Sequence, residues 1–248
     1  MTAIGLPGAD ERGYRRDIDG LRAVSLLLVI GFHSGLGLFA GGYVGVDVFF
    51  VLSGYLITGL LVKEHQRTGR ISLTDFYARR IRRLLPMSGL VLVSTVLAGL
   101  WLLPPLSRMS LVHDARAAAL YIANWRFSRQ ATAYSDAEVT DALLLHYWSL
   151  SVEEQFYFLW PLLIFGVGWF VGRRRRELFI PTLSVVLGAL IAASLWASLT
   201  LTAVRGPEAY YVTHTRLWEL GVGGALALLV PAMGRIRRPF AHGGAVLG

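Results

Sequence analysis

The sequence of 248 residues contains no cysteine, which excludes disulfides, thiolate metal sites and a cysteine nucleophile. Charge is also scarce: 16% of the residues are charged and 54% are hydrophobic, with a mean hydropathy of +0.53. These values are typical of a polytopic membrane protein and not of a soluble domain. Lysine occurs once, at Lys63, so arginine carries the net charge of +8. Most arginines fall just outside apolar runs, which indicates a topology signal and argues against nucleic acid as a partner.

Six apolar runs are long enough to cross a bilayer as helices, at about 1.5 Å per residue. They occupy residues 21–39, 43–62, 84–103, 147–171, 178–204 and 213–230. The sequence therefore predicts an all-α fold, a polytopic transmembrane helix bundle of about six spans that forms one domain over residues 1–248. The first run lacks a small-residue cleavage site, so we interpret it as an uncleaved span.

The distribution of basic residues predicts that both termini are cytoplasmic. The cytoplasmic segments then hold Arg12, Arg15, Arg16, the basic loop at 63–83, the four arginines at 173–176, and Arg235, Arg237 and Arg238. In the basic loop, Ser72 and Asp75 predict the start of a short interfacial helix. The segment 106–146 is expected to be extramembranous or re-entrant, because its apolar patch at 117–122 is too short to cross.

Ionisable side chains inside the apolar runs are candidate functional residues, because they are costly to place in a membrane. Arg22 and His33 are three helical turns plus roughly 20° apart, on one face and about 16 Å apart in depth. Glu153 and Glu154 lie about two turns below the outer end of the fourth span. Glu154 projects nearly opposite an apolar stripe suited to lipid, so we prefer Glu154 for the bundle interior. The stripe consists of Val152, Phe156, Leu159 and Leu163.

Three further candidates lie toward the outer side of the predicted bundle. Asp47 is about one turn below the outer end of the second span, and Arg216 and Glu219 are spaced i,i+3 and able to pair. All of these groups could meet His33 in one cavity open to the outside. An interhelical structural role is equally compatible with these three residues, and an intramembrane histidine can simply satisfy a helix–helix hydrogen bond.

Five motifs occur in order along the chain. They are RDIDGLRA leading to FH at 32–33, GGYVGVDVFFVLSGYLIT, DFYARRIRRLLP, HYWSLSVEEQFYFLWP and TRLWELGVGGALAL. Together they resemble the membrane-bound acyltransferase 3 family over about residues 14–229. Members of that family usually have about ten spans, often with a further extracytoplasmic hydrolase-like domain. We therefore expect an incomplete member, with the missing helices or domain supplied elsewhere.

The resemblance implies transfer of an acyl group, usually acetyl, from cytoplasmic acyl-CoA to a hydroxyl of a carbohydrate, cell-envelope or small-molecule acceptor. The Arg, ten residues, His motif of the family falls on Arg22 and His33, and its SVEEQFY signature on residues 151–157. Its Arg-x-x-Arg element falls on Arg79 and Arg82, or on Arg80 and Arg83. These four arginines are the expected acyl-CoA-binding residues, because guanidinium groups suit phosphates.

We expect His33 to be the general base, since neutral imidazole can take the proton of a hydroxyl near pH 7. Glu154 is expected to orient its ring and stabilise the imidazolium, with Glu153 as the second candidate carboxylate. Arg22 would line the path of the donor, which reaches up from the cytoplasm. Asp47, Arg216 and Glu219 are the expected acceptor-binding residues on the outer side.

The expected setting is the plasma membrane, with the lipid bilayer, acyl-CoA and a hydroxyl-bearing acceptor as partners. We expect acyl-CoA to be a co-substrate, and we expect no bound cofactor and no metal. Two alternatives stay open. An ion-coupled transporter would also need acidic residues and a histidine within spans, although no inverted repeat is visible. The other alternative is a noncatalytic partner subunit. Donor and acceptor could also both enter from the cytoplasm.

Overall fold

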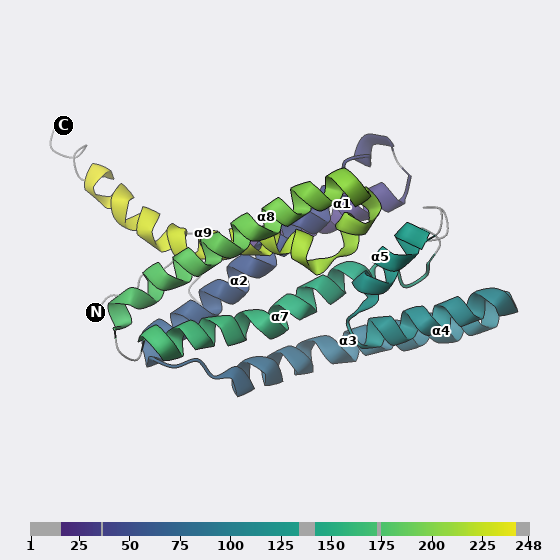
Figure 1. The fold of residues 1–248 in the computed structure, drawn as a ribbon, viewed down its shortest axis with the longest axis horizontal. Coiled ribbons are helices and arrows are strands. Elements are labelled where there is room, and N and C mark those ends of the chain that lie inside the picture. The colour runs from purple at the N-terminus through teal and green to yellow at the C-terminus, as the bar shows by residue number, and fades with distance from the viewer. Residues whose placement is uncertain (1–15, 36, 134–141, 173–174, 242–248) are drawn as a thin grey trace. The chain divides into compact units, whose positions relative to one another are not determined.

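The computed structural model describes residues 16–35, 37–133, 142–172 and 175–241 (Figure 1). The described residues contain helices and no strand, which confirms the all-α prediction. The α-helices are α1 (Arg16–His33), α2 (Val44–Thr68), α3 (Leu73–Leu102), α4 (Pro105–Ala119), α5 (Ala123–Ala133), α7 (Tyr147–Val167), α8 (Phe179–Tyr211) and α9 (Thr213–Ala241). Three short segments join them: the 3-10 helices η1 (Gly37–Phe39) and η3 (Arg176–Leu178), and the π-helix η2 (Gly168–Gly172).

Four helical stretches of the described residues are long and apolar enough to cross a membrane. They are Val44–Thr68, Leu73–Leu102, Tyr147–Gly172 and Arg176–Tyr211. They correspond to the second, third, fourth and fifth predicted spans. The first and sixth predicted spans are not among them, so the count of six and the cytoplasmic ends stay predictions. Arg12, Arg15, Arg173 and Arg174, used for the topology, lie outside the described residues.

The first predicted span is not one continuous helix. The α1 helix ends at His33, and Gly35 adopts a φ of +70°. This left-handed conformation is favourable for glycine and common just after a helix C-terminus. The chain then turns through η1 before α2 begins. The prediction of one helix over 21–39 is therefore wrong after residue 33.

The α3 helix joins two segments that the sequence analysis kept apart. Its N-cap is Ser72, whose hydroxyl accepts a hydrogen bond from the Asp75 amide at 3.3 Å and donates to the Asp75 carboxylate at 2.7 Å. The predicted start is therefore confirmed. However, the helix is not short, because it runs without a break through Pro86 to Leu102. The basic cluster at 79–83 consequently lies on the same helix as the third predicted span.

The segment after α3 turns back as two short helices, neither of which is among the four candidate spans. The predicted patch at 117–122 forms the end of α4 and the turn into α5. At that turn Tyr121 has a φ of 53°, which is uncommon for a residue other than glycine. An ion pair between Arg126 and Asp114 joins the two helices.

The chain divides into two compact units, each described here by itself. Residues 1–60 and 219–248 form unit 1, and residues 61–218 form unit 2. In unit 1, α2 and α9 pack closely through glycine. A Cβ added at Gly54 would overlap the backbone of Leu220, and one added at Gly223 would overlap the backbone of Val51. Such close backbone approach through small residues is typical of membrane helices.

In unit 2, α7 lies between α3 on one side and α5 and α8 on the other (Figure 1). The core of unit 2 contains Phe127, Leu144, Ile164 and Leu183, all fully buried. Because α7 is contacted on both sides, its side chains face two different protein surfaces.

Candidate functional site

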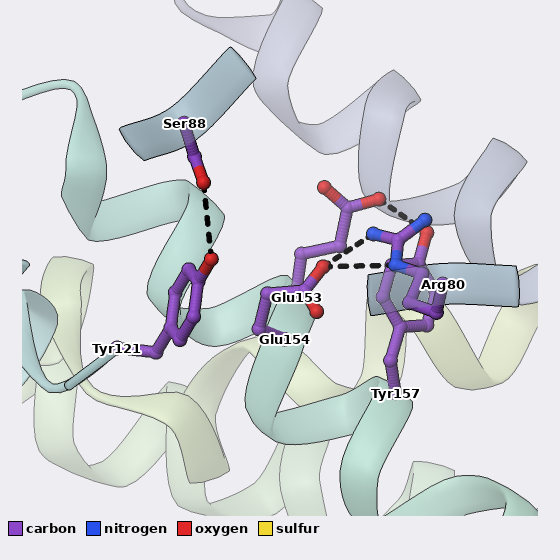
Figure 2. Close-up of polar contacts among 6 residues, drawn as sticks. All are labelled: Arg80, Ser88, Tyr121, Glu153, Glu154 and Tyr157. Atoms are coloured by element: carbon purple, nitrogen blue, oxygen red, sulfur yellow. Dashed lines mark hydrogen bonds and ion pairs between the residues drawn. The ribbon is translucent and has the colours of Figure 1, made fainter. Parts of the chain in front are cut away.

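A cluster of charged and aromatic side chains lies where α3 meets α7 (Figure 2). The Nε atom of Arg80 donates a hydrogen bond to Oε1 of Glu154 at 3.1 Å, and Nη2 donates to the same oxygen. The guanidinium carbon of Arg80 lies 3.7 Å from the centroid of the Tyr157 ring. The hydroxyl of Tyr157 in turn donates to Glu153. Arg80 therefore contacts Glu154 and the Tyr157 ring, and Tyr157 extends the cluster to Glu153.

Two tyrosine hydrogen bonds fix the register of α3 against α7 on either side of this cluster. The Tyr77 hydroxyl donates to the carbonyl of Phe158 at 2.7 Å, and the Tyr147 hydroxyl donates to the carbonyl of Ser88 at 2.6 Å. At 1.5 Å per residue, Glu154 lies about 10 Å along α7 from its first residue. The cluster thus lies within the helical stretch and not at its start.

The cluster is shielded from solvent. The side chain of Glu154 is 12% exposed and that of Arg80 is 22% exposed. Desolvated charges are costly unless they are paired, so each member stabilises the charge of the other. In a helix of this composition, such a pair is a functional-site candidate, with interhelical structure as the alternative.

The SVEEQFY motif presents two faces of α7. Glu154 and Tyr157 face α3, whereas Ser151 and Gln155, spaced i,i+4, face α5. The expected lipid-facing stripe is wrong at Val152 and Phe156, which are buried, whereas Leu159 is exposed. The preference for Glu154 as an interior residue nevertheless agrees with its burial, for a different reason, which is its contact with Arg80.

The predicted acyl-CoA cluster is divided by the structure. Arg79, Arg82 and Arg83 are exposed, and Nε of Arg82 donates to the carbonyl of Ala78 at 3.1 Å. Arg80 instead points to α7. Arg80 is therefore separated from the other three arginines, and acyl-CoA binding by this cluster stays a prediction.

Arg22 and His33 both lie on α1, with the predicted spacing. His33 is the last residue of the helix and its side chain is exposed, and its depth in the membrane stays a prediction. Its Nδ1 atom lies 2.8 Å from the carbonyl oxygen of Val29. Arg22 lies 3.9 Å from the carboxylate of Asp19, one turn earlier. The role of each residue stays a prediction.

The expected acceptor residues are distributed over both units. Asp47 is half-buried in the first turn of α2, and Glu219 is 1% exposed. Arg216 belongs to unit 2, where its guanidinium lies 4.6 Å from the Tyr210 ring centroid and 5.8 Å from that of Trp148. The gathering of these groups around His33 stays a prediction. Arg216 belongs to unit 2, whereas His33, Asp47 and Glu219 belong to unit 1.

Sequence reasoning missed several residues of unit 2. Tyr157 lies in the SVEEQFY motif, and its spacing from Glu153 and Glu154 was the signal that could have placed it near them. Gln155 lies in the same motif and makes a partly buried hydrogen-bond network with Asn124 and Thr213. No group of His, Asp and Glu among the described residues is arranged to hold a metal ion.

Comparison with known proteins supplies a family context. A family model described as an acyltransferase domain, of the acyltransferase 3 type, matches residues 15–236. The peptidoglycan O-acetyltransferase OatA of Listeria monocytogenes is 36% identical over 224 residues, covering 89% of this chain. The putative peptidoglycan O-acetyltransferase YrhL of Bacillus subtilis is 38% identical over 88% of this chain. The O-acetyltransferase OatA of Staphylococcus aureus is 37% identical over 88%.

The chain spans about a third of the length of these curated relatives, between 34% and 35%. No solved structure matches the chain. The similarity covers the segments that carry the cluster at α3 and α7.

Proposed function

Because the chain belongs to the acyltransferase 3 family, we propose that it is the membrane-embedded part of an O-acyltransferase that modifies a cell-envelope polysaccharide. The names of the relatives support acetyl as the acyl group and a hydroxyl of peptidoglycan as the acceptor. The proposed location is the plasma membrane, with the chain crossing it several times.

One observation carries the proposal beyond family membership. The DFYARRIRRLLP and SVEEQFY motifs are 74 residues apart at Arg80 and Glu154, and they meet in one shielded cluster. A structural pair needs only opposite charges. Here a second carboxylate, Glu153, and the ring of Tyr157 lie beside the pair. This arrangement supports a site that stabilises charge during a reaction.

The proposed donor is acyl-CoA, bound from the cytoplasm. Its phosphates would contact Arg79, Arg82 and Arg83, which are exposed on the first half of α3. Arg80 is left out of the proposed phosphate contacts, because it points to α7 and is not on this exposed surface. Arg22 would line the path of the pantetheine arm.

The proposed reaction uses His33 as general base. His33 takes the proton of the acceptor hydroxyl, whose oxygen attacks the thioester carbonyl. The new acyl–oxygen bond forms, the carbon–sulfur bond breaks, and the proton passes to the departing thiolate. Within unit 2, Arg80, held in place by Glu154, is the proposed cation that stabilises negative charge on the acyl donor.

The proposed acceptor-binding residues are Arg216 in unit 2, and Asp47 and Glu219 in unit 1. Arg216 lies over the rings of Tyr210 and Trp148, so this end of α7 combines a cation with flat aromatic surfaces. Aromatic rings and guanidinium groups suit a polar ring-shaped acceptor such as a sugar. Transfer would then be vectorial, with donor inside and acceptor outside.

Sealed inside-out vesicles that contain the protein at its native length test this proposal. Acetyl-CoA labelled in the acetyl group is added outside, and peptidoglycan fragments are enclosed in the lumen. We expect labelled fragments in the lumen, and none from the His33→Ala protein at an equal membrane level. The matched control is His113→Ala, because His113 is also an exposed histidine on a helix.

Two results would contradict parts of the proposal. Label found only when the fragments share the compartment of acetyl-CoA would exclude vectorial transfer. If the unsubstituted protein labels no fragments in either arrangement, acyl-CoA is not the donor. That result would favour the transporter and partner-subunit alternatives.

A further inference from the structure

Three polar side chains from different helices form a closed ring of hydrogen bonds in unit 2. Nε2 of Gln155 on α7 donates to Oδ1 of Asn124 on α5 at 2.9 Å. Nδ2 of Asn124 donates to Oγ1 of Thr213 on α9, also at 2.9 Å, and Thr213 donates back to Oε1 of Gln155. Asn124 is 0% exposed and Thr213 is 7% exposed. Gln155 is half-buried, so the ring is largely shielded, and each of its members both donates and accepts.

The ring is also attached to two backbone corners. The second Nε2 hydrogen of Gln155 is donated to the carbonyl of Tyr121 at 2.8 Å, and Nδ2 of Asn124 donates to the carbonyl of Tyr211 at 3.2 Å. Turning the Gln155 amide over would put its oxygen against two acceptors, so the network allows only one orientation. Gln155 is thereby fixed against the turn between α4 and α5 and the corner between α8 and α9.

Glu154 and Gln155 are neighbours on α7, and their side chains leave the helix about 100° apart. Fixing the direction of one side chain therefore fixes the direction of the other. A rotation of α7 by about 20° would move a carboxylate, at roughly 6 Å from the helix axis, by about 2 Å. That displacement is larger than a hydrogen bond between Glu154 and Arg80 tolerates.

Apolar contacts do not set this rotation by themselves, because they are not directional. Buried hydrogen bonds between membrane helices are directional, and a satisfied network specifies a single arrangement. We propose that Gln155 is a positioning residue: the ring of Gln155, Asn124 and Thr213 holds α7 so that Glu154 faces Arg80. This inference rests on the proposed function, in which the Arg80–Glu154 pair belongs to the acyl-transfer site.

The experiment compares two threonines of the same corner in the vesicle assay. Thr213→Val keeps the shape of the side chain and removes the hydroxyl from the ring. Thr215→Val is the matched control, because Thr215 is also fully buried and its hydroxyl donates only to the carbonyls of Ala209 and Val212. Thr213→Ser restores the hydroxyl without the methyl group.

We expect Thr213→Val to lower kcat by about tenfold or more while the KM for acetyl-CoA changes less than about twofold. Thr213→Ser should restore kcat, and Thr215→Val should stay within about threefold of the unsubstituted protein. Equal kcat values for Thr213→Val and Thr215→Val would overturn the inference. No activity in the unsubstituted protein would instead count against the proposed function.

A second measurement separates positioning from a general packing role. Arg80→Lys is introduced alone and together with Gln155→Met. Gln155→Met removes the hydrogen bonds of the ring and keeps a side chain of similar volume. If the ring aligns Glu154 with Arg80, the fold-loss caused by Arg80→Lys should be smaller once the ring is absent. Fold-losses that simply multiply would overturn the inference, as would failure of both Thr213→Val and Gln155→Met proteins to accumulate.

Discussion

The guanidinium of Arg80 is joined to the carboxylate of Glu154, with Nε 3.1 Å from Oε1. Sequence patterns assign the arginine to a donor-binding surface and the glutamate to the catalytic centre. Their contact means that α3 contributes to the same site as α7. Substitution of either residue leaves the other without its counter-ion.

Arg80→Gln should be far more damaging than Arg83→Gln. Loss of Arg80 leaves Glu154 as a shielded charge without its cation, at a cost of about 3–5 kcal/mol for a buried pair. Arg83 is exposed on the same helix and serves as the matched control. Thermal unfolding in detergent and acyl transfer in membranes measure the difference. Indistinguishable behaviour of the two variants would show that the pair contributes nothing.

Neutralising Arg79 and Arg82 together should raise the apparent KM for acyl-CoA and leave kcat nearly unchanged. Each exposed guanidinium is expected to contact a donor phosphate equally in the ground state and in the transition state. Loss of such binding raises KM and leaves kcat unchanged. Initial rates over a range of acetyl-CoA concentrations measure this effect. Arg108→Gln, outside this cluster, is the control. An unaltered KM would reduce Arg79 and Arg82 to a topology signal.

His33→Ala should reduce acyl transfer by about 10²–10⁴-fold, the usual contribution of a general base. The variant should accumulate normally, because the His33 side chain is exposed and its contact with the Val29 carbonyl is local to α1. Initial rates, corrected for membrane level by immunoblot, provide the measurement. Activity within a few-fold of the unsubstituted protein would remove His33 from the mechanism.

Gly54→Ala should destabilise unit 1, whereas Gly59→Ala on the same helix should not. A Cβ at position 54 would overlap the backbone of Leu220, which cannot move like a flexible side chain. At position 59 the nearest atom is the Cβ of Ala227, at an ordinary contact distance of 3.8 Å. Overpacking costs typically about 1–3 kcal/mol. Melting temperatures in detergent compare the two variants, and equal values would contradict the close approach of α2 and α9.

The sequence by itself determined the features that depend on local physical chemistry. Long apolar runs predict helices, so four of the six predicted spans correspond to helices able to cross a membrane. Ser72 caps α3 because its hydroxyl and the Asp75 backbone are only three residues apart. The α3 helix ends at the C-cap Leu103, just before Pro104, and Pro105 begins α4, because the first position of a helix tolerates proline. The ordered motifs likewise indicated the family that the family model matches.

Only the tertiary structure decided which way each helix faces. In a membrane, both lipid and neighbouring helices are apolar, so hydropathy does not distinguish a lipid-facing valine from a buried one. That is why Val152 was expected to face lipid and is fully buried instead. The pairing of Arg80 with Glu154, and of Gln155 with Asn124 and Thr213, depends on the rotation and register of helices distant in sequence. Local patterns carry no information about either quantity, because both are set by contacts that exist only after the helices have packed.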